Sequence, residues 1–256
     1  MKKRLFNLEN KKAIVVGGAG DLGKEMVTSL CLSGVQVVVI DRTVDLDRWT
    51  SSLSSEILPG KDIFGLTVDL ADRNNLVKGF EEAINILGSI DILVNAQGIQ
   101  RRFPSEDFPI QVWDEVIEIN LTSVFEMCQL AGRVMLKKGY GKIINIASMQ
   151  SFIGGYHIPA YAASKAGVGI ITKALSNEWA SRGINVNAIA PGYMDTKMTS
   201  AIKADQVRYE KLLTRIPAGR WGNPNDLCGA LIFLASAASD YVNGVVLPVD
   251  GGMLGA

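Results

Sequence analysis

The sequence has only three cysteines, one histidine and no long block of like charge. Its 26 Lys and Arg balance 26 Asp and Glu, which gives a formal net charge of +0 and a pI near 6.6. Because no basic stripe is present to neutralise phosphates or anionic lipid, we expect neither nucleic acid nor a membrane surface as partner. The single histidine, His157, excludes a histidine-based metal site, and we expect no metal.

The cysteines give a second exclusion. Cys31, Cys128 and Cys228 are an odd number, lie far apart and form no CxxC pair. Each has apolar neighbours, so we expect buried free thiols in a reducing compartment. The residues after Met1–Arg4 lack the apolar stretch of a secretory signal. These features together predict a cytoplasmic protein.

Short runs rich in valine and isoleucine recur along the chain. They are continuous rather than alternating, as in parallel strands covered on both faces. The runs are Ala13–Val16, Val35–Ile40, Ile63–Val68, Ile90–Val94, Lys142–Ile146, Ile184–Ile189 and Val245–Val249. Helical spacing lies between them, at Asp21–Ser33, Asp72–Leu87, Gln111–Lys138, Ala162–Arg182 and Asn225–Ala237. The alternation predicts an α/β fold in which residues 1–256 form one doubly wound domain, a seven-stranded parallel sheet with helices on both faces.

One segment departs from this alternation. Residues 193–221, after the sixth predicted strand, form a long insertion where a short connection is expected. Loops of this length inside a compact domain are usually functional or mobile. We expect a lid over the substrate, and a plain surface excursion is the alternative.

A glycine-rich turn follows the first predicted strand. Gly17, Gly18, Gly20 and Gly23 lie between that strand and the next helix. Glycines there let the backbone turn tightly and approach a pyrophosphate at the helix N-terminus. The pattern alone is weak in a chain with 26 glycines, but its position strengthens it. It predicts a dinucleotide site, with a tight turn without ligand as the alternative.

The second predicted strand ends at Asp41, close to the ~20-residue spacing of a carboxylate that binds ribose hydroxyls. A carboxylate there repels a 2′-phosphate, so we predict NAD as cofactor, with NADP less favoured. The neighbouring Arg42 weakens this preference. A solvated turn residue or helix cap is the alternative for Asp41.

Three residues predict proton chemistry. Tyr161 and Lys165 are one helical turn apart, so their side chains share one face of the predicted helix. A phenol titrates near 10, and a fixed ammonium beside it would lower that pKa and make it a usable acid and base. Ser148 follows the fifth strand, at the edge where open α/β sheets bind ligands, and its hydroxyl could hold the substrate oxygen.

Further motifs complete the pattern. They are Asp69-Leu70, Asn95-Ala96-Gln97-Gly98, Asn120 and Pro191-Gly192, in this order along the chain. With the glycine loop and the Ser148, Tyr161 and Lys165 set, the sequence resembles the short-chain dehydrogenase/reductase family over essentially its whole length. The resemblance implies a Rossmann-like fold and an enzyme that interconverts a secondary alcohol and a ketone with NAD(P).

The resemblance implies a role for each catalytic residue. Tyr161 would donate and accept the proton, Lys165 would bind the nicotinamide ribose and lower the phenol pKa, and Ser148 would orient the substrate oxygen. Asn120 would hold a water that extends the proton relay. A polar helix residue without a catalytic role is the alternative for Asn120.

The resemblance also assigns dinucleotide contacts. Asp69 would contact the adenine, Asn95 and Gly98 would line the ribose, and the turn at residues 191–194 with Thr196 would hold the carboxamide. For Asp69, capping of the next helix is the alternative. The expected cofactor-binding residues are Gly17, Gly20, Asp21, Leu22, Gly23, Asp41, Arg42, Asp69, Leu70, Asn95, Gly98, Tyr161, Lys165, Pro191, Gly192, Met194 and Thr196.

Two departures from the family pattern stand out. The glycine loop has Val16 for the usual threonine and Asp21 for the middle glycine. We expect the Asp21 side chain to turn away from the pyrophosphate and cap the helix. The turn after the fourth strand has Ala96-Gln97 where Asn-Ala is usual, so its hydrogen bonds should differ.

Within the family, residues 141–149, 187–194, 215–222 and 238–244 look most like sugar-acid dehydrogenases of the gluconate and 2-keto-3-deoxygluconate type. Such a substrate is small, polyhydroxylated and anionic. Arg101 and Arg102 would recognise its carboxylate, since a guanidinium binds a carboxylate bidentately; solvated arginines are the alternative. The other expected substrate contacts are Ser148, Gln150, Tyr161 and Tyr193.

Two other functions stay open. A 3-oxoacyl-carrier-protein reductase, or another NADPH-linked carbonyl reductase, would share the catalytic residues. Asp41 and the missing basic patch for an acidic carrier disfavour it. A catalytically idle NAD-binding scaffold would not need an intact catalytic set.

The C-terminal segment, residues 245–256, is apolar for an exposed tail. By the family resemblance it would pack at a subunit interface, which implies a homotetramer. Burial against the chain's own sheet is the alternative.

Overall fold

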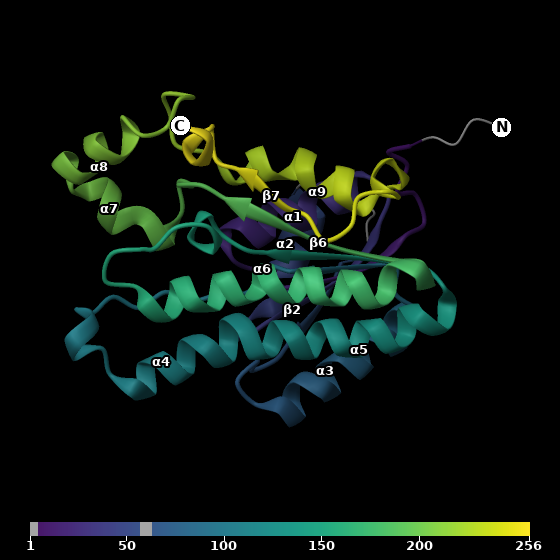
Figure 1. Ribbon diagram of the computed structural model, residues 1–256. Coiled ribbons are helices and arrows are strands. Elements are labelled where there is room, and N and C mark those ends of the chain that lie inside the picture. Colours follow the sequence, from purple (N-terminus) through teal and green to yellow (C-terminus); the bar gives the residue numbers. More distant parts are fainter. Residues whose placement is uncertain (1–4, 57–62) are drawn as a thin grey trace.

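A parallel sheet forms the centre of the molecule, with strand order β3-β2-β1-β4-β5-β6-β7 (Figure 1). The computed structural model describes residues 5–56 and 63–256, so Met1–Arg4 of the signal argument lie outside it. The strands are β1 (Lys12–Val16), β2 (Gln36–Asp41), β3 (Ile63–Thr67), β4 (Ile92–Asn95), β5 (Gly141–Ile146), β6 (Ile184–Pro191) and β7 (Val246–Val249). The predicted seven-stranded doubly wound sheet is confirmed, with strand ends shifted by a residue or two.

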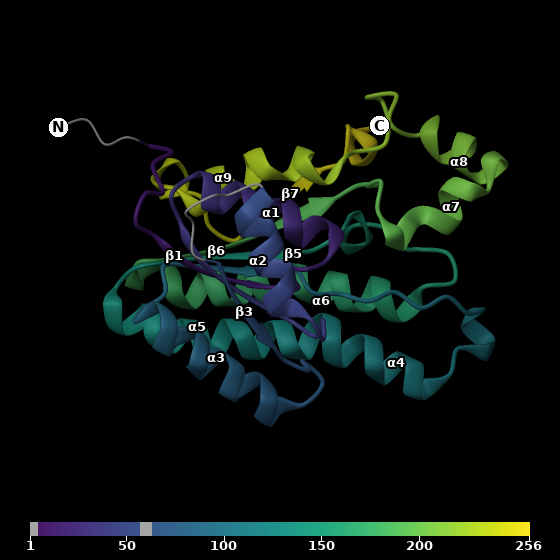
Figure 2. The same cartoon turned by 180° about the vertical axis from the view of Figure 1, so that it is seen from behind.

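Helices cover both faces of the sheet (Figure 2). One face carries α1 (Asp21–Leu32), α2 (Leu46–Glu56) and α9 (Cys228–Ala235), and the other carries α3 (Arg73–Leu87), α5 (Ser123–Lys138) and α6 (Pro159–Trp179). The remaining helices are α4 (Ile110–Ile117), α7 (Ser200–Ala204) and α8 (Gln206–Leu213). Short 3₁₀ turns lie at Ser105–Asp107, Met149–Ser151, Ala180–Arg182, Lys197–Thr199, Pro224–Leu227, Ala237–Ser239 and Met253–Gly255.

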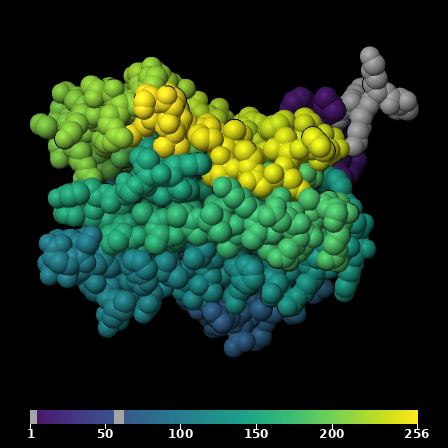
Figure 3. Space-filling model, viewed as in Figure 1, coloured from purple at the N-terminus to yellow at the C-terminus, as the bar shows by residue number. Residues whose placement is uncertain are grey.

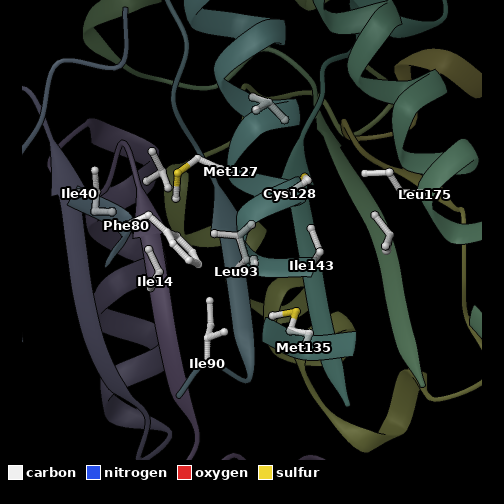
Figure 4. Close-up of a cluster of buried hydrophobic side chains, with 14 of the residues drawn as sticks. Ile14, Ile40, Phe80, Ile90, Leu93, Met127, Cys128, Met135, Ile143 and Leu175 are labelled. Carbon is white, nitrogen blue, oxygen red and sulfur yellow. The ribbon is translucent and has the colours of Figure 1, made fainter. Parts of the chain in front are cut away.

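The continuous apolar strands bury side chains on both sides of the sheet. On one side, Ile14, Leu93 and Ile143 pack against Phe80 of α3 and Met127 of α5 (Figure 4). Alternate residues of the same strands pack on the other side against α1, α2 and α9. The side chains of both layers are almost completely buried. Because burial stabilises a fold in proportion to the apolar area removed from water, these layers hold the sheet and its edge in place. The site at that edge therefore rests on a rigid support.

The helices differ from the sequence prediction in three ways. The apolar spacing does not predict α2, which is rich in serine and polar on average, or the short α7 and α8. The single helix expected at Gln111–Lys138 is α4 and α5 joined by a π-helical turn at Glu118–Thr122. The helix expected at Asn225–Ala237 begins with a 3₁₀ turn and continues as α9.

The segment expected as a lid, residues 193–221, is folded rather than irregular. Met194 and Gly222 form a parallel bridge, so the two ends of the segment lie side by side. Ile202, Ile216 and Trp221 form a small core of their own with Met149 and Met253. In the space-filling view α7 and α8, in light green, form a block at one end of the molecule, beside the C-terminal residues in yellow (Figure 3).

Two further expectations concern the cysteines and the C-terminal segment. The three cysteines are buried and none is in a disulfide, as predicted. Among the described residues, no helix has both the length and the apolar character that crossing a membrane requires. In the C-terminal segment, β7 pairs with β6 and Met253 is 5% exposed, so this chain itself covers part of it.

Candidate active site

Two hollows lie at the carboxyl edge of the sheet and meet at the turn after β4, where Ala96, Gln97 and Gly98 line both. The glycine-loop hollow lies beside the ends of β1, β2 and β3. The tyrosine hollow, which contains Tyr161, lies beside the ends of β5 and β6. It encloses about 820 Å³ of empty space, part of which is open to solvent. The strand order reverses between β1 and β4, where such folds bind ligands.

The tyrosine hollow brings together the three residues of the predicted proton chemistry. Ser148 follows β5, and Tyr161 and Lys165 lie in successive turns of α6. Pro159 at the helix start presets the backbone for this helix. As the spacing predicts, both α6 side chains face the same hollow. Ser148 accepts a hydrogen bond from the Gln150 N–H at 3.2 Å, which orients its hydroxyl.

Lys165 is a buried amine, only 3% exposed. Its Nζ donates to the Ile146 carbonyl oxygen at 2.6 Å. The turn after β4 closes over it, because a Cβ on Gly98 would lie 3.3 Å from the Lys165 Nζ. Burial lowers the pKa of Lys165 to about 8, since removal from water disfavours the charged form. The amine is therefore cationic below that pH and neutral above it.

The structure changes one expectation about Tyr161. Burial raises the pKa of the Tyr161 phenol, and a hydrogen bond with Ser148 acts in the opposite direction. The sequence predicts a lowered pKa through Lys165. The opposite direction follows because the Lys165 Nζ is bonded to the Ile146 carbonyl and water is removed from around the phenol. In the free protein Tyr161 is therefore a protonated phenol over a wide pH range.

Asn120 lies in the π-helical turn between α4 and α5, and such turns often occur at functional sites. The wider turn lets its side chain leave the helix. Its Nδ2 donates to the Ile99 carbonyl at 2.9 Å and to Ser164 Oγ at 3.1 Å, and its Oδ1 accepts from the Ile99 N–H at 2.8 Å. Asn120 thus connects the turn after β4 with α6. It is fully buried and lies behind the lining of the tyrosine hollow.

The glycine-loop hollow is built on close backbone contacts. Gly17 has φ +73°, and a Cβ on it would lie 2.6 Å from the Gln97 backbone nitrogen. A Cβ on Gly23 would lie 2.2 Å from the Gly17 carbonyl oxygen. Both positions therefore require glycine, as the motif predicts. Gly17 and Gly20 line the hollow, whereas Gly23 lies behind them and holds the turn.

The acidic residues of this hollow are fixed by backbone amides. Asp41 Oδ2 accepts from the Ala19 N–H at 3.0 Å, and its Oδ1 accepts from the Thr43 N–H at 3.1 Å. Its carboxylate is thus held at the mouth of the glycine loop. Arg42, Asp69 and Leu70 line the same hollow, as expected of cofactor contacts. The cap of α3 is Asp72, so the alternative capping role does not belong to Asp69.

Asp21 turns away from the glycine loop, but not into the expected cap. The N-cap of α1 is Gly20, and no side chain caps it. Asp21 Oδ2 instead accepts from the Lys197 N–H at 2.6 Å, in the first 3₁₀ turn of the lid segment. The expectation of a cap is therefore wrong. The reason is that the Lys197 N–H, at the start of a 3₁₀ turn of the lid segment, lies within reach of the Asp21 carboxylate at the start of α1.

Besides Asp21, Gly23 and Asn120, two more predicted site residues lie outside both hollows. Asn95 is fully buried, and its Nδ2 donates to Asn145 Oδ1 at 2.9 Å and contacts Cys128 Sγ at 3.3 Å. Its side chain therefore ties β4 to β5 and does not line the ribose position. Arg101 forms an ion pair with Glu115 at 2.8 Å, and the tyrosine hollow does not include it. The two adjacent arginines thus have different surroundings.

The remaining predicted residues line the tyrosine hollow. They are Leu22, Gly98, Arg102, Gln150, Pro191, Gly192, Tyr193, Met194 and Thr196. Sequence reasoning missed other lining residues, among them Met198, Thr199 and Ile202 of the lid segment. The apolar spacing of residues 198–213 is the signal that could have found them, because it matches two short helices.

Comparison with known proteins agrees with this arrangement. A family model described as "Enoyl-(Acyl carrier protein) reductase", of the short-chain dehydrogenase/reductase family, matches residues 17–254. The chain belongs to the short-chain dehydrogenase/reductase family. It is 46% identical to the 2-dehydro-3-deoxy-D-gluconate 5-dehydrogenase of Dickeya dadantii, over 97% of each chain. It is 41% identical to the 5-keto-D-gluconate 5-reductase of Escherichia coli, over 98% of each chain.

Solved structures of family members have the same fold. A gluconate 5-dehydrogenase from Burkholderia cenocepacia, described in complex with NADP and tartrate, is 38% identical with a TM-score of 0.92, over 98% of each chain. A protein from Agrobacterium tumefaciens, described with bound NADP, is 43% identical with a TM-score of 0.90, over 99% of this chain and 100% of that one. As a member of the family, this chain is an oxidoreductase that acts on an alcohol or carbonyl group.

Proposed function

We propose that this protein interconverts a secondary alcohol and a ketone on a small sugar acid of the gluconate or 2-keto-3-deoxygluconate type, with NAD as preferred cofactor. The observation that carries the proposal is the meeting of Ser148, Tyr161 and Lys165 in one hollow, directly beside the glycine loop. The names of the relatives support the substrate class.

In the reducing direction, the Tyr161 hydroxyl gives its proton to the substrate oxygen. The raised pKa keeps this proton on the phenol until it is needed. Ser148, whose Oγ is oriented by the Gln150 N–H, donates a hydrogen bond to the same oxygen and stabilises the charge that develops there. The Lys165 ammonium, one turn along α6, favours the phenolate that remains and binds the nicotinamide ribose.

Asn120 contributes to the proposed reaction by fixing the turn after β4. By bonding both backbone groups of Ile99, it fixes the chain next to Gly98, where the two hollows meet. We propose that this position also holds the water of the proton relay. A substitution of Asn120 would then displace the turn and slow proton delivery without removing an acid or a base.

The residues of the glycine-loop hollow fit a dinucleotide. A Cβ at Gly17 or Gly23 would clash with the backbone of Gln97 or of Gly17, so glycine at both positions permits the tight turn that a pyrophosphate-binding loop requires. When bound, the nicotinamide supplies or accepts the hydride. Asp41 favours the 2′-hydroxyl of NAD over the 2′-phosphate of NADP through its fixed negative charge. Two of the solved relatives are described with bound NADP, so the preference for NAD rests on Asp41 of this chain.

Two parts of the proposal concern location and assembly. We place the protein in the cytoplasm because its three cysteines are buried thiols and none is in a disulfide. We propose a homotetramer because large apolar side chains are exposed on two adjacent helices, Phe125 on α5 at 41% and Ile170 on α6 at 63%. The C-terminal segment would extend a second interface.

A substrate panel tests the proposal. Purified protein is assayed with 5-keto-D-gluconate, 2,5-diketo-3-deoxy-D-gluconate and an acetoacetyl thioester, each with NADH and with NADPH. We expect the keto sugar acids to be reduced with NADH at the highest kcat/KM. Preferred reduction of the thioester with NADPH would contradict the proposal and favour a 3-oxoacyl reductase.

A further inference from the structure

A second hollow opens next to the tyrosine hollow, on the side of the lid. Arg102, Gln150, Ile158 and Tyr193 line both, so the two spaces are continuous. We call the second one the cationic basin. Its other polar wall comes from α8 and the turn after it, namely Arg208, Lys211 and Arg215. Of the residues that the structure describes, no acidic one lines the basin.

The cations of the basin have no carboxylate partner. Within residues 5–56 and 63–256, Arg102, Arg208, Lys211 and Arg215 form no ion pair. Arg102 donates only to neutral acceptors, the Tyr156 carbonyl at 3.4 Å and Gln100 Oε1 at 3.2 Å. In a chain of zero net charge, four unpaired cations around one hollow are a local excess that an anion would balance.

Two observations indicate that these charges are close together and that a buried acceptor beside them has no hydrogen-bond partner among the described residues. Burial and the neighbouring Arg208 both lower the pKa of Arg102, which is the effect of like charges facing each other. Gln150 Oε1 is a buried acceptor without a hydrogen-bond partner among the described residues. A ligand with both an acid group and hydroxyls would satisfy the arginines and the amide at once.

We propose that the cationic basin is the carboxylate subsite, in which Arg208 of the lid and Arg102 of the main fold bind the acid group of the substrate together. This inference rests on the proposed sugar-acid function and assigns recognition of the carboxylate to these two arginines. Lys211 and Arg215 stand farther out along the same wall and attract the anion. Because Arg208 belongs to α8, the acid group links the lid to the main fold when it binds. Arg101, paired with Glu115, takes no part.

A matched pair of substrates tests the subsite. L-Sorbose is the neutral counterpart of 5-keto-D-gluconate, with a hydroxymethyl group in place of the carboxylate. We expect Arg208→Gln to raise KM for 5-keto-D-gluconate about 10- to 100-fold, the loss of one charge-assisted contact. The kcat for this substrate and the kcat/KM for L-sorbose should stay within about threefold of wild type.

Arg101→Gln is the control, because it removes the same charge one residue from Arg102 but outside the basin. It should leave the ratio of the two substrates unchanged. Equal losses on both substrates in Arg208→Gln, or no loss on the acid, would overturn the subsite. An effect of Arg101→Gln as large as that of Arg208→Gln would overturn it as well.

A binding measurement separates this inference from the proposed function. If wild type reduces neither compound, the proposed function fails. Calorimetric titration of the NADH-loaded protein with D-gluconate and D-glucitol then tests the subsite alone. Tighter binding of gluconate that is lost in Arg208→Gln would support the subsite, and equal binding of the two compounds would overturn it.

Discussion

The main fold and the lid segment contribute different things to the same hollow. Ser148 directly follows β5, and Tyr161 and Lys165 lie on α6; both elements share the large core of the sheet. Residues 193–221 pack with Met149 and Met253 on a second, smaller core and contact the hollow through Tyr193, Met198 and other lid side chains. The proposed chemical groups thus lie beside the large core, whereas Arg208 of the proposed carboxylate subsite lies on α8, beside the smaller one. We therefore expect substitutions in the two regions to affect turnover and substrate binding separately.

The largest expected difference between the two regions comes from a tyrosine-to-phenylalanine substitution made once in the main fold and once in the lid segment. Tyr161→Phe on α6 removes the proton donor, so turnover should fall by at least about 10³-fold, while NADH binding stays near wild type. Tyr193→Phe at the start of the lid segment should change kcat by less than about threefold. Stopped-flow absorbance of NADH measures both. Comparable rates in the two variants would mean that Tyr161 is not the acid.

The second prediction concerns the buried amine of the main fold. Burial lowers the pKa of Lys165 to about 8, so the ammonium is present below that pH and lost above it. The kcat for ketone reduction should therefore fall about tenfold per pH unit above pH 8. Lys165→Met should be slow at every pH and show no change near pH 8. A wild-type profile that is flat to pH 10 would exclude a role for the charge.

The sequence predicts the main fold and its catalytic residues better than the contacts between distant side chains. The strands, the glycine loop and the Ser148, Tyr161 and Lys165 set are predictable because local spacing determines them. The positions of the Asn95, Arg101 and Asp21 side chains are not predictable, because each is bound by a partner on another structural element that only the fold brings close. The cationic basin is not predictable from the sequence for the same reason, since only the fold brings α8 next to Arg102.

The third prediction tests the glycine-loop hollow. Asp41→Ala removes the carboxylate that the Ala19 and Thr43 amides hold in place. The ratio of kcat/KM for NADH to that for NADPH should fall about tenfold, because a like-charge repulsion is lost. Steady-state kinetics with both dinucleotides measure it. An unchanged ratio would mean that Asp41 does not contact the ribose. The KM for the keto acid is the control, because it should stay near wild type unless the substitution disturbs the rest of the site.

The smallest expected effect lies at the contact between the regions. Asp21→Ala removes the hydrogen bond from the Lys197 N–H, so KM for the keto acid should rise about threefold to fivefold, the value of one such bond. Hydrogen exchange of residues 193–204 should become faster. Asp21→Asn keeps an acceptor and should exchange nearly as wild type does. Equal exchange in all three proteins would show that this bond does not hold the lid.

A double-mutant cycle tests the division of labour most directly. The kcat/KM for 5-keto-D-gluconate is measured in wild type, Lys165→Met, Arg208→Gln and the double variant. If the main fold supplies the chemistry and the lid the recognition, the two losses in transition-state free energy add to within about 0.5 kcal/mol. A coupling energy above about 1 kcal/mol would contradict that account, because it would make the two regions a single catalytic unit.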